Sequence, residues 1–146
     1  MRKLLLAIII SLFLCCFLTA SASAHCEIPC GIYDDEMRIQ MIGEHITTIE
    51  KSMNEIVKLE KGKGHHSNQL VRWIMNKEHH ADEIQEVVTQ YFMTQRIKLD
   101  TKNYEKKLGL LHQMLLYSMK CKQTTNLDNP GKLRLLIKEF HDLYFK

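Results

Sequence analysis

Residues 35–61, DEMRIQMIGEHITTIEKSMNEIVKLEK, carry the most regular pattern of apolar residues in this chain. These apolar residues recur every three or four positions, which is the spacing of one face of an α-helix. Asp34 and Asp35 stand at the start of the stretch, where a side-chain cap and acidic charges stabilise a helix N-terminus. Residues 62–64 (GKG) follow, and glycines of this kind end helices. A long amphipathic helix is therefore predicted, and its apolar face needs partners. That face consists of Ile42, Ile46, Ile49, Met53 and Ile56.

Three more segments have helical spacing. Apolar residues place a second helix at about residues 67–95 and a third at about 101–122. The fourth is predicted to begin with Asn129 as its cap and Pro130 in its first turn, where a missing N–H costs nothing. The predicted core-facing residues are Leu70, Trp73, Ile74, Lys77, Ala81, Ile84, Val87, Val88 and Tyr91, then Tyr104, Leu108, Leu111, Leu115 and Met119, then Leu133, Leu136, Ile137, Phe140, Leu143 and Tyr144.

Four amphipathic helices with short connections predict an all-α protein, an antiparallel four-helix bundle over residues 35–146. No alternation typical of strands competes with this interpretation. The apolar face of the second helix becomes thin at residues 77–80, so this part is predicted to face polar groups. A di-iron carboxylate site, which four-helix bundles also support, is excluded because no glutamate is followed by histidine three residues later.

The first 24 residues are predicted to be a signal peptide. Met1-Arg2-Lys3 is a positive start, residues 4–18 (LLLAIIISLFLCCFL) are apolar and uncharged, and Ala22-Ser23-Ala24 is a cleavage signal. The apolar run is short for a membrane span, which needs about 20 residues. We therefore expect export to the periplasm or the extracellular space, with no membrane contact after cleavage by signal peptidase.

The mature chain would begin at His25 and be almost neutral. The full chain has 20 basic and 17 acidic side chains, and the leader removes Arg2 and Lys3, which leaves a net charge of +1. Such a balance predicts no nucleic-acid partner. Of the five cysteines, three remain after cleavage. Cys26 and Cys30 are interpreted either as a disulfide or as two metal thiolates, with Cys121 buried and inert in both cases.

Residues 25–34 (HCEIPCGIYD), called the hook below, are predicted to be an irregular metal-binding loop, because Pro29 and Gly31 break regular structure. Cleavage before His25 would expose its α-amine beside its imidazole. The amide nitrogen of Cys26 and the thiolates of Cys26 and Cys30 add three more donors. Two nitrogens and two sulfurs in a plane suit nickel or copper, whereas zinc prefers a tetrahedron. Because thiolates lower the redox potential of bound nickel, the donor set indicates redox chemistry.

The hook resembles the nickel-binding motif HC-x-x-PCG-x-Y of the nickel-containing superoxide dismutase family. The segments KEHHA at 77–81 and QYFMTQR at 90–96 are also similar to family segments. The matching hook residues are His25, Cys26, Pro29, Cys30, Gly31 and Tyr33, followed by Asp34.

The resemblance implies a ligand set and a reaction. One nickel ion per subunit would be bound by the His25 amine, the Cys26 amide and the thiolates of Cys26 and Cys30, with the His25 imidazole as axial ligand. Tyr33 would guard the open face and hydrogen-bond small anions. The chain would convert superoxide to O2 and H2O2 by Ni(II)/Ni(III) cycling, and the family forms homohexamers.

The sequence departs from the family pattern around the axial histidine. Glu27 stands where the family usually has aspartate. Some members steady the histidine with a glutamate early in the first helix and an arginine in the second. Here Gln40 or Met41 stands at the first position, and His79 or His80 at the second. One of these two histidines is a candidate to reach the hook.

An alternative from another functional class is an exported nickel or copper carrier that uses the same loop without catalysis. Tyr33 favours the enzyme, because a carrier does not require it. No functional role is predicted for the remaining histidines and aromatic residues. His65 and His66 are expected to be solvated, His45, His112 and His141 to be isolated on helices, and Trp73, Tyr91 and Phe92 to be core residues.

Overall fold

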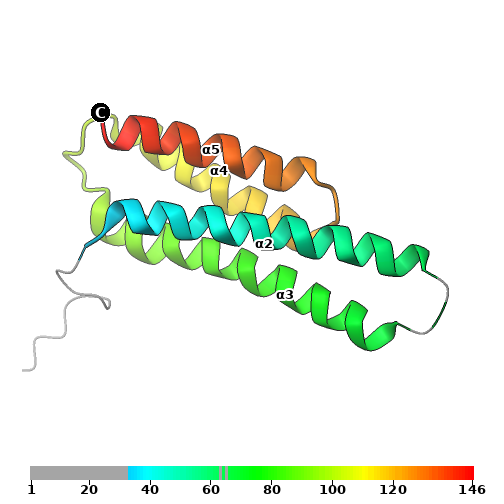
Figure 1. The fold of residues 1–146 in the computed structure, drawn as a ribbon. Coiled ribbons are helices and arrows are strands. Elements are labelled where there is room, and N and C mark those ends of the chain that lie inside the picture. The colour runs from blue at the N-terminus through cyan, green and yellow to red at the C-terminus, as the bar shows by residue number, and fades with distance from the viewer. Residues whose placement is uncertain (1–32, 63, 65) are drawn as a thin grey trace, which may run out of the picture. The chain divides into compact units, whose positions relative to one another are not determined.

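The computed structural model describes residues 33–62, 64 and 66–146. This part is helical and has no strand (Figure 1). Its elements are α2 (Asp35–Lys61), α3 (Ser67–Glu86), which continues as the π-helix η1 (Val87–Arg96), α4 (Tyr104–Gln123) and α5 (Asp128–Tyr144). The predicted all-α four-helix bundle is confirmed. The predicted signal peptide and hook residues 25–32 lie outside the described residues.

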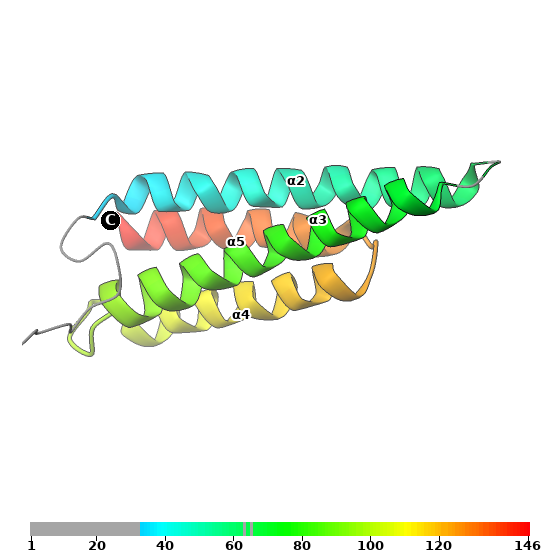
Figure 2. The same ribbon diagram turned by 90° about the horizontal axis from the view of Figure 1, so that it is seen from below.

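The helices form a ring in which α2 packs on α3 and α5, and α4 packs on the same two helices. The start of α2, the end of η1 and the end of α5 lie at one end of the bundle (Figures 1 and 2). At the other end, the α2–α3 hairpin extends beyond α4 and α5 (Figures 1 and 2). Fully buried side chains fill the centre, and each contributes about 1.5–3 kcal/mol. The largest are Phe92, Phe140, Ile42, Ile46, Ile49, Met53, Ile84, Leu111, Met114 and Leu133.

The ends of the helices have identifiable causes. Asp34 caps α2 as predicted, because its Oδ1 accepts a hydrogen bond of 2.9 Å from the backbone N–H of Met37. The predicted cap of the fourth helix is wrong. Asn129 lies inside the first turn of α5, and Asn126 Oδ1 instead accepts from the N–H of Asp128 at 2.9 Å. Pro130 occupies the first turn, as predicted.

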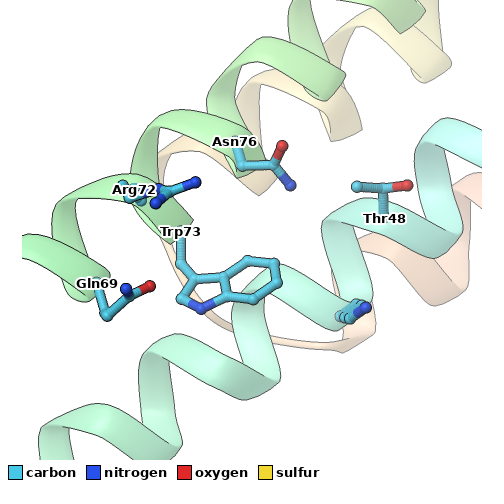
Figure 3. Close-up of a pocket in the computed structure, with 6 residues that line it drawn as sticks. Thr48, Gln69, Arg72, Trp73 and Asn76 are labelled. Atoms are coloured by element: carbon cyan, nitrogen blue, oxygen red, sulfur yellow. The ribbon is translucent and has the colours of Figure 1, made fainter.

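Three other predictions about the core are wrong, those for Ile74, Met119 and Trp73. Ile74 is 36 % exposed on α3. Met119 is 41 % exposed, because the buried face of α4 turns toward Ser118 and Cys121, small residues that a search for large apolar side chains passes over. Trp73 is only half-buried and, with Thr48 and Asn76, lines a surface cleft of ≈ 440 Å³ between α2 and α3 (Figure 3). It lies one turn beyond Lys77, the level at which α4 ends.

The expected polar surroundings of residues 77–80 are confirmed. Lys77, only 4 % exposed as a residue, donates through its ammonium to the carbonyl oxygens of Lys122, in the last turn of α4, and of Thr124, which follows it. Burial lowers the pKa of Lys77. His80 Nδ1 lies 2.8 Å from His45 Nδ1, so the expectation that His45 is isolated is wrong. His141 is not isolated either, because its Nε2 lies 3.0 Å from Glu36 Oε2.

Candidate functional site

The structure describes part of the predicted metal site. His25, Cys26 and Cys30 lie outside the described residues, so their predicted roles as ligands stay predictions. Within the described residues, no three His, Cys, Asp or Glu side chains gather in a group that could hold a metal ion. Cys121 is fully buried, and burial raises the pKa of its thiol to about 12. It therefore remains a protonated core residue, which agrees with its predicted inertness.

Tyr33, the predicted anion-binding residue, is 43 % exposed at the start of the described chain. The guanidinium carbon of Arg96 lies 4.3 Å from the centre of its ring, and the ring of Tyr91 meets it edge-on at 6.0 Å. Its hydroxyl has no hydrogen-bond partner among the other described residues. Arg96 and Tyr91 thus contact the ring of Tyr33, and none of the described residues bonds its hydroxyl.

Asp35 lies beneath this contact, at the centre of a hydrogen-bonded cluster. Oδ1 accepts from the Tyr91 hydroxyl at 2.5 Å. Oδ2 accepts from Arg96 Nε at 3.1 Å, from Arg96 Nη2 at 2.7 Å and from the Tyr144 hydroxyl at 2.7 Å. We call these four residues, Asp35, Tyr91, Arg96 and Tyr144, the Asp35 cluster. It joins the start of α2, the π-helix and the end of α5.

The cluster shifts the titration of its own members. Burial by itself would raise the pKa of Asp35, but the hydrogen bonds from Arg96, Tyr91 and Tyr144 outweigh burial, so the pKa is lowered. Burial and the same carboxylate raise the pKa of Tyr144 to about 12, and they raise that of Tyr91 further. At neutral pH the cluster therefore holds one carboxylate, one guanidinium and two neutral phenols.

The π-helix gives Arg96 its place in the cluster. In η1 the chain makes wider i→i+5 turns, as the 2.9 Å hydrogen bond from Ile97 N–H to Phe92 C=O shows. Tyr91 and Phe92 are both buried within it. The hydrogen bonds from Arg96 to Asp35 place this end of η1 beside the start of α2, at the left of Figure 1. Insertions of π-helical turns into α-helices are frequent at functional sites.

Arg38 also contacts Tyr91, with its guanidinium carbon 5.0 Å from the ring centre. Its Nη1 contacts the sulfur of Met41 at 3.7 Å, and its buried Nε has no hydrogen-bond partner in the described part of the chain. Gln40, the other residue considered as a support for the axial histidine, bonds Glu36 at 3.4 Å on the surface.

The two histidines of the second helix have different surroundings. The side chain of His79 is 66 % exposed, and its Nε2 lies 3.8 Å from Glu83. His80 pairs with His45, whose buried Nε2 has no partner within the described residues. Burial, and then the neighbouring histidine, lower the pKa of His45, and His80 is shifted in the same direction. The prediction that one of these histidines reaches the hook stays a prediction.

Sequence analysis did not assign Asp35, Arg96 and Tyr144 to the site. Asp35 was interpreted as a helix-start charge, and Tyr91 and Tyr144 as core residues. The similarity of QYFMTQR to family segments was a signal for Tyr91 and Arg96, since it covers both. Tyr144 is 109 residues from Asp35 in the sequence, and no local pattern joins them.

Comparison with known proteins completes the description of the site. The model of the family described as nickel-containing superoxide dismutase matches residues 20–146. The match includes every hook residue and the whole helical bundle. No curated protein and no solved structure matches the chain.

Proposed function

The chain belongs to the nickel-containing superoxide dismutase family, and we propose that residues 25–34 are the hook through which it performs this activity. As a member of the family it is an oxidoreductase that contains nickel and converts superoxide to O2 and H2O2. The observation that carries the assignment is the match over residues 20–146, since it covers the HC-x-x-PCG-x-Y motif and the bundle together. No finding favours the metal carrier.

We assign the metal ligands to the first six residues of the mature chain. The donor set fits nickel, because the His25 amine and the Cys26 amide offer nitrogen, and Cys26 and Cys30 offer sulfur. The His25 imidazole would offer a further nitrogen. A nickel ion held there would supply the Ni(II)/Ni(III) redox couple for the conversion of superoxide to O2 and H2O2. The thiolates of Cys26 and Cys30 would lower the redox potential of this couple, because they are electron-rich donors.

Tyr33 has the role of holding the anion. Its ring is supported by Arg96 and Tyr91, and its hydroxyl has no partner within the described residues. A phenol so placed can donate a hydrogen bond to superoxide or to the peroxide product. Tyr33 follows the proposed ligand Cys30 by only three residues, so the two lie close together in the sequence.

Export and assembly are further parts of the proposal. Residues 1–24 are removed by signal peptidase after Ala24, which frees the His25 amine in the periplasm or outside the cell. In the part of the chain that the structure describes, no helix is both long and apolar enough to cross a bilayer. The mature subunit assembles into a homohexamer, as the family resemblance implies.

The test compares two proteins that differ by one residue. Residues 25–146 with a free His25 are reconstituted with nickel beside the same chain carrying one extra residue ahead of His25. We expect rapid superoxide dismutation from the first protein, with nickel and not with copper or zinc, and strong loss in the second. Metal binding without dismutation by either protein would instead support the carrier. Mature protein isolated with residues still ahead of His25 would refute the cleavage site.

A further inference from the structure

We propose that the ion pair of Asp35 and Arg96 is a positioning element that holds the ring of Tyr33, and thereby its hydroxyl, in place for the reaction. This inference rests on the proposed role of Tyr33 and goes beyond it. It makes two residues outside the hook motif responsible for the placement of the anion-binding phenol.

Arg96 makes two contacts at the same time. Its Nε and Nη2 both donate to Asp35, at 3.1 and 2.7 Å, and its guanidinium carbon lies 4.3 Å from the centre of the Tyr33 ring. Both nitrogens donate to the same oxygen, Asp35 Oδ2, and because a guanidinium is flat and rigid, the two hydrogen bonds restrain where its face can lie. The surface on which Tyr33 rests is therefore set by Asp35, although Asp35 itself makes no ring contact with Tyr33.

Asp35 is in turn held from two further elements. Tyr91 donates to it from the π-helix at 2.5 Å, and Tyr144 donates from the end of α5 at 2.7 Å. The side chain of Asp35 is 14 % exposed and that of Arg96 is 28 % exposed. A pair so enclosed is weakly screened by solvent, so Arg96 cannot swing away without leaving a partly buried charge unpaired.

The position in the chain gives this pair its effect on the hook. Tyr33 lies three residues after Cys30 and two residues before Asp35. Arg96 contacts both Tyr33 and Asp35, so it restrains the chain at the point where the hook joins the bundle. A short tether restrained in this way limits the places that the Tyr33 hydroxyl can reach.

A second ion pair in the same bundle supplies a matched control. Arg134 donates to Glu50 through the same two nitrogens, Nε to Oε1 at 3.1 Å and Nη2 to Oε2 at 2.5 Å, although Arg96 directs both of its nitrogens to the single oxygen Oδ2 of Asp35. Its guanidinium makes no cation–π contact with an aromatic ring of the described chain. The side chains of Arg134 and Glu50 are 43 % and 29 % exposed. Replacement of an arginine in a purely structural ion pair such as this one is expected to leave Tyr33 in place.

The first experiment measures the position of Tyr33 without nickel and without activity. The mature chain is labelled with 3-fluorotyrosine, and the Tyr33 signal is assigned by its loss in Tyr33→Phe. Arg96→Lys keeps the charge and removes the flat face and the paired donors. We expect the Tyr33 fluorine signal to move toward that of free fluorotyrosine in Arg96→Lys, and to stay in place in Arg134→Lys. An unchanged Tyr33 signal in a folded Arg96→Lys protein overturns the proposal.

The second experiment asks whether Arg96 acts through the Tyr33 hydroxyl. At equal nickel content, we expect Arg96→Lys to lower the dismutation rate by roughly tenfold, since small misplacements of catalytic groups carry losses of this order or more. In a Tyr33→Phe background the same change should have almost no further effect, because coupled residues are not additive. Equal losses in both backgrounds would overturn the positioning role.

The two experiments separate this inference from the function on which it rests. A nickel-loaded wild-type protein without dismutase activity would refute the proposed function, and the fluorine signal would still decide whether Arg96 holds Tyr33. If the wild-type protein is active but Arg96→Lys does not change the Tyr33 fluorine signal, the proposed function is supported and the positioning role of Asp35 and Arg96 is refuted. Far-UV circular dichroism of each variant confirms that the bundle is folded.

Discussion

Replacement of Asp35 by asparagine should destabilise the bundle more than its position in the first turn of a helix suggests. The carboxylate accepts four hydrogen bonds, two from Arg96 and one each from Tyr91 and Tyr144. Asparagine offers one acceptor oxygen, and its NH2 group would face donors. Hydrogen bonds to a charged group contribute about 1.5–3 kcal/mol, and removal of one partner of a buried ion pair costs about 3–5 kcal/mol. Because this pair is partly exposed, we expect Asp35→Asn to cost about 2–3 kcal/mol.

The assay is urea unfolding at pH 7 of the nickel-free mature protein, followed by far-UV circular dichroism. Glu50→Gln is the control, and it should cost less than about 1 kcal/mol because its pair with Arg134 is more exposed. If Asp35→Asn costs no more than Glu50→Gln, the view of Asp35 as the centre of a cooperative cluster is refuted.

The same variant predicts a pH dependence. The pKa of Asp35 is lowered in the folded protein, so its stabilising contribution is fully present above the unfolded pKa of about 3.9. This contribution is lost as the pH falls through the folded pKa. The difference in unfolding free energy between wild type and Asp35→Asn should therefore be constant from about pH 7 to 5 and shrink below about pH 4. A constant difference down to pH 2 would contradict the assigned shift.

Three further predictions concern residues outside this cluster. Burial lowers the pKa of His45 and His80 in the folded state, so the free energy of unfolding should fall as the pH drops below the unfolded pKa of about 6.5. In urea unfolding, a variant with glutamine at both positions should show a smaller change of this free energy between about pH 7 and 5. Met114→Ala should cost about 2–5 kcal/mol because Met114 is fully buried, whereas Met119→Ala, at 41 % exposure, should change stability by less than about 0.5 kcal/mol in the same assay. Cys121 should not react with a thiol reagent in the folded protein at pH 8, and Cys121→Ala should bind as much nickel as wild type by metal analysis; rapid labelling would show that the thiol is accessible.

The helices could be predicted where their causes are local. The predicted bounds of the first helix match α2, because its stripe, the Asp34 cap and the glycines at 62 and 64 all lie within or beside it. The register of α4 could not be predicted in the same way. Its buried face includes Ser118 and Cys121, and whether such small residues face a core depends on the neighbouring helices. Trp73 shows the converse, since a large apolar residue stays half-exposed where the hairpin extends beyond its partners.

The hook motif is enough to identify the family and the chemistry that goes with it. Five donors from three residues stand within six positions of a predicted cleavage site, and a contiguous motif can be recognised without any knowledge of the fold. The structure decided what surrounds Tyr33. Asp35, Arg96 and Tyr144 are far apart in the chain, and they meet because the start of α2, the π-helix and the end of α5 meet at one end of the bundle. That meeting depends on how three helices pack and on the extra width of the π turns, which no local pattern of residues encodes.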